Sequence, residues 1–326
     1  LELQTAAHYR TAFNAYLGQQ LGKREPEQLY EPMVYIMGLG GKRMRPVLTL
    51  MAANALKGDY RDALPAALAL ELFHNFSLVH DDIMDAAPLR RGKVTVHEKW
   101  DTNTGILSGD AMLIRAYQLF ETYEPVLFKP LVALFSRTAL QVCEGQQYDV
   151  DFEAREVVLM EEYLHMIRNK TAVLLGACMQ TGAMIAGTPP DVQQAAYEFG
   201  LHLGMAFQLQ DDYLDAFGDP RTFGKQPGGD IIENKKTFLY LKSLELAGPG
   251  GVKELEHLFS IRPQDPAAKI GAVKDIYQSS GADRAAREEI LRYTEKAFAQ
   301  LEKLPLGKEA YAQFHAFGEQ LRKRNI

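Results

Sequence analysis

Apolar residues recur at helical spacing along most of the chain, and clusters of proline or glycine separate these stretches. No convincing run of alternating β-branched residues indicates strands. The pattern predicts an all-α fold, with helices at roughly residues 3–22, 46–57, 65–86, 105–122, 130–150, 158–187, 190–217, 235–247, 266–279, 283–303 and 306–323. Because no segment has the composition of a linker, we expect a single domain over residues 1–326, built as one large helical bundle.

The overall composition is that of an ordinary globular protein. The 326 residues are 47% hydrophobic and 24% charged, and the net charge is −6. A general nucleic-acid-binding protein would carry a basic excess, so nucleic acid is not an expected partner. The longest uncharged stretch, residues 171–187, is short for a membrane span, so we expect a core helix there and no stable membrane span. Cys143 and Cys178 form no zinc-like or disulfide-like pattern, which favours a reducing cytoplasm.

A first cluster of carboxylates lies in the predicted helix over residues 65–86. Asp81 and Asp85 are one turn apart on one face of that helix, and Asp82 lies beside them. Three acids on one turn repel one another. We therefore expect a cation to compensate them.

A second cluster lies in the predicted helix over residues 190–217. Its members occupy positions i, i+3, i+4 and i+7 of a helix with apolar flanks: Gln208, Asp211, Asp212 and Asp215. A solvated acidic helix end could explain one cluster, but unpaired carboxylates are rare on core helices. Hard oxygen ligands without cysteine point to Mg²⁺, which binds through one or two carboxylates and substrate phosphates.

Basic residues accompany the acids although the chain as a whole is acidic. Residues 40–46, GGKRMRP, combine two glycines that allow close backbone approach with three cations suited to phosphate oxygens. The segment is not a Walker loop, because GxxxxGK[ST] is absent. Other basic residues follow a cluster or open an apolar helix: Arg90, Arg91, Lys170, Lys225 and Lys235. Each alone could be solvated, but together with the acids they suggest a substrate with a diphosphate head and an apolar tail.

These motifs resemble those of the trans-isoprenyl diphosphate synthases, also called polyprenyl synthetases. The order and spacing match over residues of about 15–320. The matching motifs are GGKRMRP (40–46), ELFHNFSLVHDDIMD (71–85), LRRGK (89–93), GD (109–110), EGQ (144–146), NKT (169–171), FQLQDDYLD (207–215) and GKQPGGDIIENKKT (224–237). The first aspartate motif lacks the two-residue insertion of some bacterial farnesyl synthases.

The resemblance implies two substrates and a role for each motif. Isopentenyl diphosphate would be bound by Gly41, Lys42, Arg45, His74 and Arg91. The allylic diphosphate would be bound by Arg90, Lys170, Thr171, Gln208, Lys225 and Lys235. Mg²⁺, as three ions when diphosphate is bound, would be held by Asp81, Asp85 and Asp211. The residues implied to be catalytic are Asp81, Asp82, Asp85, Arg90, Lys170, Asp211, Asp212 and Lys225. Family members are usually homodimers, so a homodimer is expected.

The implied chemistry agrees with these residue types. An allylic C–O bond ionises when charge on the departing diphosphate is stabilised, as Mg²⁺, lysine and arginine do. The isopentenyl double bond then attacks the carbocation, and the bound diphosphate can take the released proton. A central apolar pocket in the bundle would exclude water, which would quench the cation.

Aromatic residues before the first aspartate motif predict the product length. Phe76 lies five residues before Asp81, which is about 7.5 Å along a helix, and Phe73 lies on a similar face. Two rings there would act as a floor for the growing chain, while the small Ser77 leaves room beyond a C10 product. In the related family this pattern resembles short-chain enzymes, so we expect C15 to C20 products, with geranylgeranyl diphosphate ahead of farnesyl diphosphate.

Three other functions are compatible with parts of the sequence. Glu71-x-x-His74 and Glu162-x-x-His165 resemble the ligand pairs of a di-iron carboxylate bundle, but they leave both aspartate clusters unexplained. A class I terpene cyclase would share the first cluster but would not need a second phosphate site. A non-catalytic subunit of a heteromeric prenyl synthase would be expected to lose aspartates, and this chain retains all six.

Overall fold

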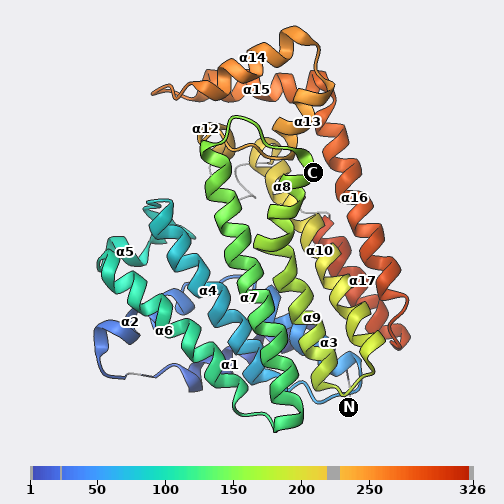
Figure 1. Cartoon of the computed structure of the whole chain (residues 1–326). Coiled ribbons are helices and arrows are strands. Elements are labelled where there is room, and N and C mark those ends of the chain that lie inside the picture. The colour runs from blue at the N-terminus through green and yellow to red at the C-terminus, as the bar shows by residue number, and fades with distance from the viewer. Residues whose placement is uncertain (1–2, 23, 219–227, 323–326) are drawn as a thin grey trace. The chain divides into compact units, whose positions relative to one another are not determined.

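The protein is described by a computed structural model that covers residues 3–22, 24–218 and 228–322 (Figure 1). Almost all regular structure in these residues is helical, so the predicted all-α class is confirmed. The helices are α1 (Ala6–Gln20), α2 (Glu27–Gly38), α3 (Met44–Ala55), α4 (Leu64–Met84), α5 (Val96–Lys99), α6 (Thr102–Phe120), α7 (Pro125–Ala154), α8 (Met160–Ile167), the π-helix η1 (Arg168–Ala172), α9 (Val173–Ile185), α10 (Pro190–Phe217), α12 (Gly229–Ile232), α13 (Phe238–Leu246), α14 (Pro249–Ser260), α15 (Ala267–Ser280), α16 (Ala282–Leu301) and α17 (Lys308–Arg322). Strands β1 (Leu89–Arg90) and β2 (Lys93–Val94) pair as a short antiparallel hairpin.

The chain forms two compact units. The first unit comprises Leu1–Ala139, Ala177–Tyr197 and Leu304–Ala310, and the second comprises Leu140–Gly176, Glu198–Lys303 and Tyr311–Ile326. Neither unit is a continuous piece of chain, because the chain passes between them within α7, α9, α10 and α17 and also between α16 and α17. The single domain expected over residues 1–326 stays a prediction.

The first unit is built on α3 and α4, which pack against each other, while α4 also packs along α6 (Figure 1). Every residue from Pro46 to Ala55 in α3 is buried. The C-terminal part of α9 approaches α3 closely, since a Cβ atom on Gly182 would lie 2.4 Å from the carbonyl oxygen of Thr49. This packing gives rigid support to α4, whose last turn carries the first aspartates.

In the second unit, α10 packs closely against the residues that join η1 to α9. A Cβ atom on Gly200 would lie 2.4 Å from the carbonyl oxygen of Leu175, and one on Gly204 would lie 2.6 Å from the Cα atom of Ala172. Glycine is therefore required at both positions for this approach. Gln208 follows one turn later on the same face of α10, so the contact sets its position.

The structure differs from the predicted elements mainly at prolines. Residues 249–260 form α14, because Pro249 opens the helix where its missing N–H is not needed. Pro130 lies inside α7 and Pro32 inside α2, a helix that the sequence pattern did not predict. The predicted helix over residues 158–187 is divided by η1, and the one over 65–86 ends at Met84.

One helix within the described part of the chain, α7, is long and apolar enough to cross a membrane by length and composition. Of its most apolar window, 33% is buried. Core helices of soluble proteins meet the same criteria, so the predicted lack of a stable span is not decided by this helix.

Candidate functional site

The first aspartate cluster lies at the C-terminal end of α4. Asp81 and Asp82 belong to its last turn, and Asp85 is the C-cap residue. The helix dipole is negative at this end, so carboxylates there are unfavourable without a cation. Such a position is therefore expected for residues that serve function rather than stability.

The side chain of Asp82 is buried and paired with Arg90. Its side chain is 1% exposed, and its Oδ1 atom lies 2.6 Å from an Nη atom of Arg90. The Arg90 Nε atom also donates to both carboxylate oxygens, at 2.8 and 2.9 Å. Burial raises the pKa of Asp82, while Arg90 opposes that shift. Asp82 thus orients Arg90, which places its guanidinium at the first cluster.

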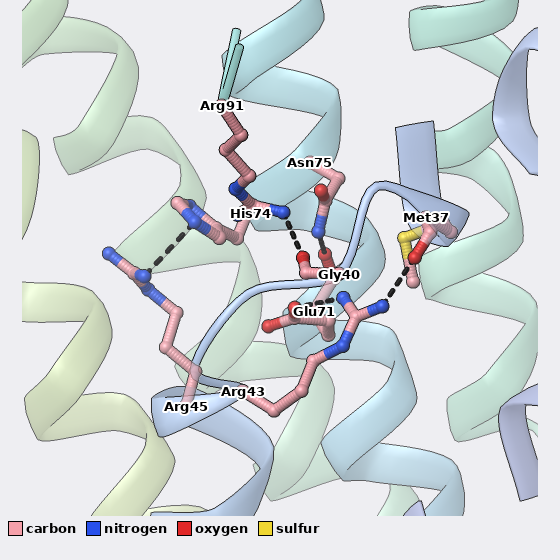
Figure 2. A network of polar contacts seen from close by, with 8 residues as sticks. All are labelled: Met37, Gly40, Arg43, Arg45, Glu71, His74, Asn75 and Arg91. Carbon is pink, nitrogen blue, oxygen red and sulfur yellow. Dashed lines mark hydrogen bonds and ion pairs between the residues drawn. The ribbon is translucent and has the colours of Figure 1, made fainter. Parts of the chain in front are cut away.

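A group of cations in the same unit surrounds His74 on α4 (Figure 2). Arg45 Nη1 lies 3.1 Å from His74 Nε2, and Arg91 donates to the carbonyl oxygen of Gly40. Gly41 is held at a φ of +126°, and a Cβ atom there would lie 3.0 Å from the Arg91 guanidinium carbon. The glycine pair therefore lets Arg91 reach the 40–46 segment.

His74 is a neutral hydrogen-bonding group in this setting. Burial lowers its pKa well below the usual value, and the nearby arginines lower it further, with Arg45 the largest contributor among them. Arginine can only donate, so His74 Nε2 accepts and Nδ1 carries the proton. Within the described residues, neither Arg45 nor Arg91 forms an ion pair with a carboxylate. Their two charges are suited to an external anion.

The second unit contains a pocket of about 190 Å³ with charged walls. Its lining brings together acids, lysines and apolar residues from α7, α8, η1, α10 and the segment around α12. These residues are Asp149, Phe152, Glu153, Tyr163, Met166, Ile167, Lys170, Thr171, Gln208, Asp211, Asp212, Asp215, Asp230, Lys235, Lys236 and Thr237. The pocket thus combines four of the residues predicted to bind an allylic diphosphate with the second aspartate cluster.

A chain of hydrogen bonds fixes the polar side of this pocket. Thr171 donates to Gln208 Oε1 at 2.9 Å, and the Gln208 amide donates to Asp212 Oδ1 at 2.8 Å. The hydroxyl of Tyr163 donates to Asp212 Oδ2 at 2.5 Å. Burial raises the pKa of Asp212 to about 7, against the effect of these hydrogen bonds. Asp212 therefore organises its neighbours in the way that Asp82 organises Arg90.

Asp215 at the end of α10 supports the chain that follows. Its backbone oxygen accepts from the Gly228 N–H at 2.7 Å, and its Oδ2 atom accepts from the Asp230 N–H at 3.0 Å. Lys225, one of the residues predicted to bind the allylic diphosphate, lies outside the described residues. These two hydrogen bonds fix residues 228–230, where the described chain resumes, to the end of α10.

Lys170 and Thr171 lie in the π-helix η1. A π-helical turn inside a helix is uncommon and is found often at functional sites. Lys170 Nζ pairs with Asp149 Oδ2 of α7 at 2.5 Å, and Lys235 Nζ pairs with Glu233 at 3.2 Å. Lys170 therefore points toward an acid that lines the pocket, whereas the Glu233 partner of Lys235 is not part of the lining.

The EGQ motif on α7 needs glycine at position 145, because η1 passes very close to it. A Cβ atom at this position would lie 2.2 Å from the backbone nitrogen of Lys170. We expect Gly145→Ala to displace η1, to lower stability by about 1–3 kcal/mol and to reduce turnover. Thermal unfolding and a condensation assay measure both effects. Gly271→Ala is the matched control, because nothing lies within 4 Å of its Cβ position on α15. A Gly145→Ala variant with wild-type melting and turnover would show that this close approach is not required.

The pocket chemistry fits a hard divalent cation. Its anionic donors are carboxylate oxygens, and no cysteine or histidine lines it. Across residues 3–22, 24–218 and 228–322, no three acidic, histidine or cysteine side chains are already gathered as a metal site. Mg²⁺ typically uses only one or two carboxylates and completes its shell with phosphate and water.

Sequence reasoning missed three partners in the second unit. They are Asp149, which pairs with Lys170, Tyr163, which binds Asp212, and Lys236, whose Nζ donates to the carbonyl oxygen of Phe152 at 3.0 Å. Lys236 stands beside Lys235 in the NKKT segment, so the sequence marks it as a candidate cation of the site. Nothing local in the sequence marks the other two residues.

The predicted chain-length residues form an aromatic cluster in the first unit. The Phe76 ring lies 5.6 Å from Phe73 and 4.7 Å from His80, measured between ring centres. Phe73 also packs edge-to-face on Phe135 at 5.4 Å. Ser77 donates to the His74 carbonyl oxygen at 2.9 Å. Phe76 is 9% exposed, so it is a largely buried ring held by other rings.

Comparisons with known proteins place the whole chain among proteins of one family. The sequence model of the polyprenyl synthetase family matches residues 26–278. The chain is similar to a geranylgeranyl diphosphate synthase of Methanosarcina mazei, with 35% identity over 86% of this chain and 89% of that protein. It is also similar to a geranylfarnesyl diphosphate synthase of Natronomonas pharaonis, with 37% identity over 92% of this chain and 91% of that protein. A crystal structure of a geranylgeranyl pyrophosphate synthase superposes with a TM-score of 0.96 and 51% identity, covering 99% of this chain and 100% of that chain.

Proposed function

This chain belongs to the polyprenyl synthetase family, and we propose that it joins isopentenyl diphosphate to an allylic diphosphate of C5 to C15. The product would be a trans prenyl diphosphate of C15 to C20 and inorganic diphosphate. The observation that carries the proposal is the presence of two separate cationic sets, one around Arg45 and Arg91 and one around Lys170. A terpene cyclase needs only one diphosphate site.

Isopentenyl diphosphate is assigned to the first set. Gly41, Lys42, Arg45, His74 and Arg91 would bind its diphosphate. Two guanidinium groups without carboxylate partners give charge for phosphate oxygens. The proton on His74 Nδ1 supplies a neutral donor that does not depend on pH near neutrality.

The allylic diphosphate is assigned to the second set. Its oxygens would be bound by Arg90, Lys170, Thr171, Gln208, Lys225 and Lys235. Binding would draw Lys170 from Asp149 toward a stronger anion. Asp82 and Asp212 act here as orienting groups, because both are buried and already bound to protein donors.

Three Mg²⁺ ions would be held through Asp81, Asp85 and Asp211 together with the substrate's phosphates. When bound, Mg²⁺ neutralises charge that develops on the departing diphosphate. Lys170 would add fixed positive charge at the leaving group. The apolar residues around the site would keep water from the carbocation, and the released proton would pass to diphosphate, so no protein base is assigned.

Product length gives a prediction for Phe76. We expect Phe76→Ala to lengthen the product beyond C20, because the substitution removes a ring from the floor of the tail site. Chromatography of dephosphorylated products measures the distribution. Phe314→Ala is the control, since Phe314 is also a buried ring but packs on Phe199 in the second unit. An unchanged distribution in Phe76→Ala would show that this ring does not limit the chain.

The experiment that tests the function is incubation with Mg²⁺, labelled isopentenyl diphosphate and C5, C10 or C15 primers. Prenyl diphosphates of C15 to C20 support the proposal. A hydrocarbon formed from one diphosphate would indicate a cyclase, and no product from any primer would indicate a non-catalytic subunit.

We also propose a cytoplasmic homodimer. Leu107 and Ile114 lie seven residues apart on one face of α6 and are 59% and 57% exposed. Exposed apolar residues of this size on one face favour a protein contact. Sedimentation measures the assembly, and a monomer at micromolar concentration would contradict it.

A further inference from the structure

Arg43 and Glu71 form an ion pair that neither proposed phosphate site uses. Their side chains are 5% and 4% exposed, and Arg43 Nη1 lies 2.7 Å from Glu71 Oε1. The other Nη atom of Arg43 donates to the carbonyl oxygen of Met37. One side chain thus links the last turn of α2, the start of α3 and the middle of α4 (Figure 2).

Stability alone does not account for this pair. Removing two charges from water is costly, and apolar residues of similar size often stabilise a fold as well or better. What the guanidinium offers is a planar fork that bonds two acceptors in fixed directions. The pair is therefore suited to setting an orientation.

The orientation that Arg43 sets is that of the 40–46 segment. Gly40, Gly41 and Arg43 have φ angles of +77°, +126° and +50°. A residue other than glycine in this left-handed region is strained and needs support from its surroundings. The two bonds of the Arg43 side chain supply that support between Lys42 and Arg45, which flank it in the chain.

The orientation that Glu71 sets is that of α4 beside His74. Glu71 lies one turn before His74, and the Asn75 side chain donates to the Glu71 carbonyl oxygen at 2.8 Å. Burial lowers the pKa of both Arg45 and Arg91, and the Glu71 carboxylate is the largest influence in the opposite direction. Glu71 thus reduces the repulsion within the arginine group while its carboxylate is paired with Arg43.

We propose that Arg43 and Glu71 are positioning residues, which hold the cations of the 40–46 segment and His74 in register for isopentenyl diphosphate without touching it. The inference rests on the proposed function. It assigns a task to the arginine of the GGKRMRP segment that pairs with Glu71.

The test compares steady-state kinetics of Glu71→Gln and Arg43→Lys with the wild type. We expect the KM for isopentenyl diphosphate to rise about tenfold or more, with the KM for the allylic primer within about twofold. Glu289→Gln is the matched control, because Glu289 pairs with Arg292 on α16 in the second unit. It is expected to leave both constants unchanged.

A double variant, Arg43→Met with Glu71→Met, separates positioning from folding. We expect its melting temperature to equal or exceed that of the single variants, while the KM for isopentenyl diphosphate stays raised. If the double variant recovered both the wild-type melting temperature and the wild-type KM for isopentenyl diphosphate, the inference would be overturned. Equal rises in both KM values in the single variants, or a wild-type KM in Glu71→Gln, would overturn it as well. A wild type that forms no prenyl product would overturn the proposed function itself, whereas an active wild type with unaffected variants would overturn only the positioning role.

Discussion

Asp211→Ala is expected to reduce turnover of the condensation by about 10²–10³-fold or more, because the leaving diphosphate loses charge stabilisation in the transition state. Asp211 lies near the C-terminal end of α10 and lines the pocket of the second unit. A carboxylate at that end of a helix gains nothing from the helix dipole, so the melting temperature is expected to change little. Turnover is measured at saturating concentrations of both substrates.

The control for this prediction is Asp275→Ala on α15, an exposed acid away from the pocket. It is expected to retain wild-type turnover. Excess EDTA should abolish activity in the wild type, and added Mg²⁺ should restore it. Full activity in excess EDTA would contradict the metal-dependent mechanism, and a wild-type rate for Asp211→Ala would remove this residue from it.

Arg45→Ala and Lys170→Ala are expected to weaken different substrates. Each loses a charged hydrogen bond worth about 1.5–3 kcal/mol, which corresponds to a rise in KM of about 10- to 150-fold. Arg45→Ala should act mainly on isopentenyl diphosphate, and Lys170→Ala mainly on the allylic primer. Initial rates with each substrate varied in turn measure both constants.

Lys42 and His74 should follow Arg45, and Lys225 should follow Lys170. The controls are Arg10→Ala and Lys253→Ala, which remove exposed charges of the same kind from α1 and α14. If Arg45→Ala raised both KM values equally, the assignment of two separate diphosphate sites would be wrong.

Local signals in the sequence were enough for the class of fold and for most helices. The apolar periodicity gave the bounds of α10 as residues 190–217, which is where the helix lies. The sequence-based helix bounds were wrong at Pro249, which opens a helix, and at Pro130, which lies near the start of one. A proline is tolerated at such positions because few backbone hydrogen bonds are lost there. The π-helical turn around Lys170 had no local signal, since its residues are compatible with an α-helix.

The sequence by itself determined which chemical groups are present and which of them share a helix face. The spacing of Asp211, Asp212 and Asp215 follows from helix geometry, and the glycines of residues 40–41 indicate close approach. Only the tertiary structure decided the partners: Arg43 with Glu71, Lys170 with Asp149 and Tyr163 with Asp212 are 28, 21 and 49 residues apart. Such pairs depend on how helices pack, and the packing is set by close contacts such as that of Gly145 with Lys170. For this reason two adjacent aspartates, Asp81 and Asp82, are not equivalent: burial against Arg90 makes Asp82 an orienting group.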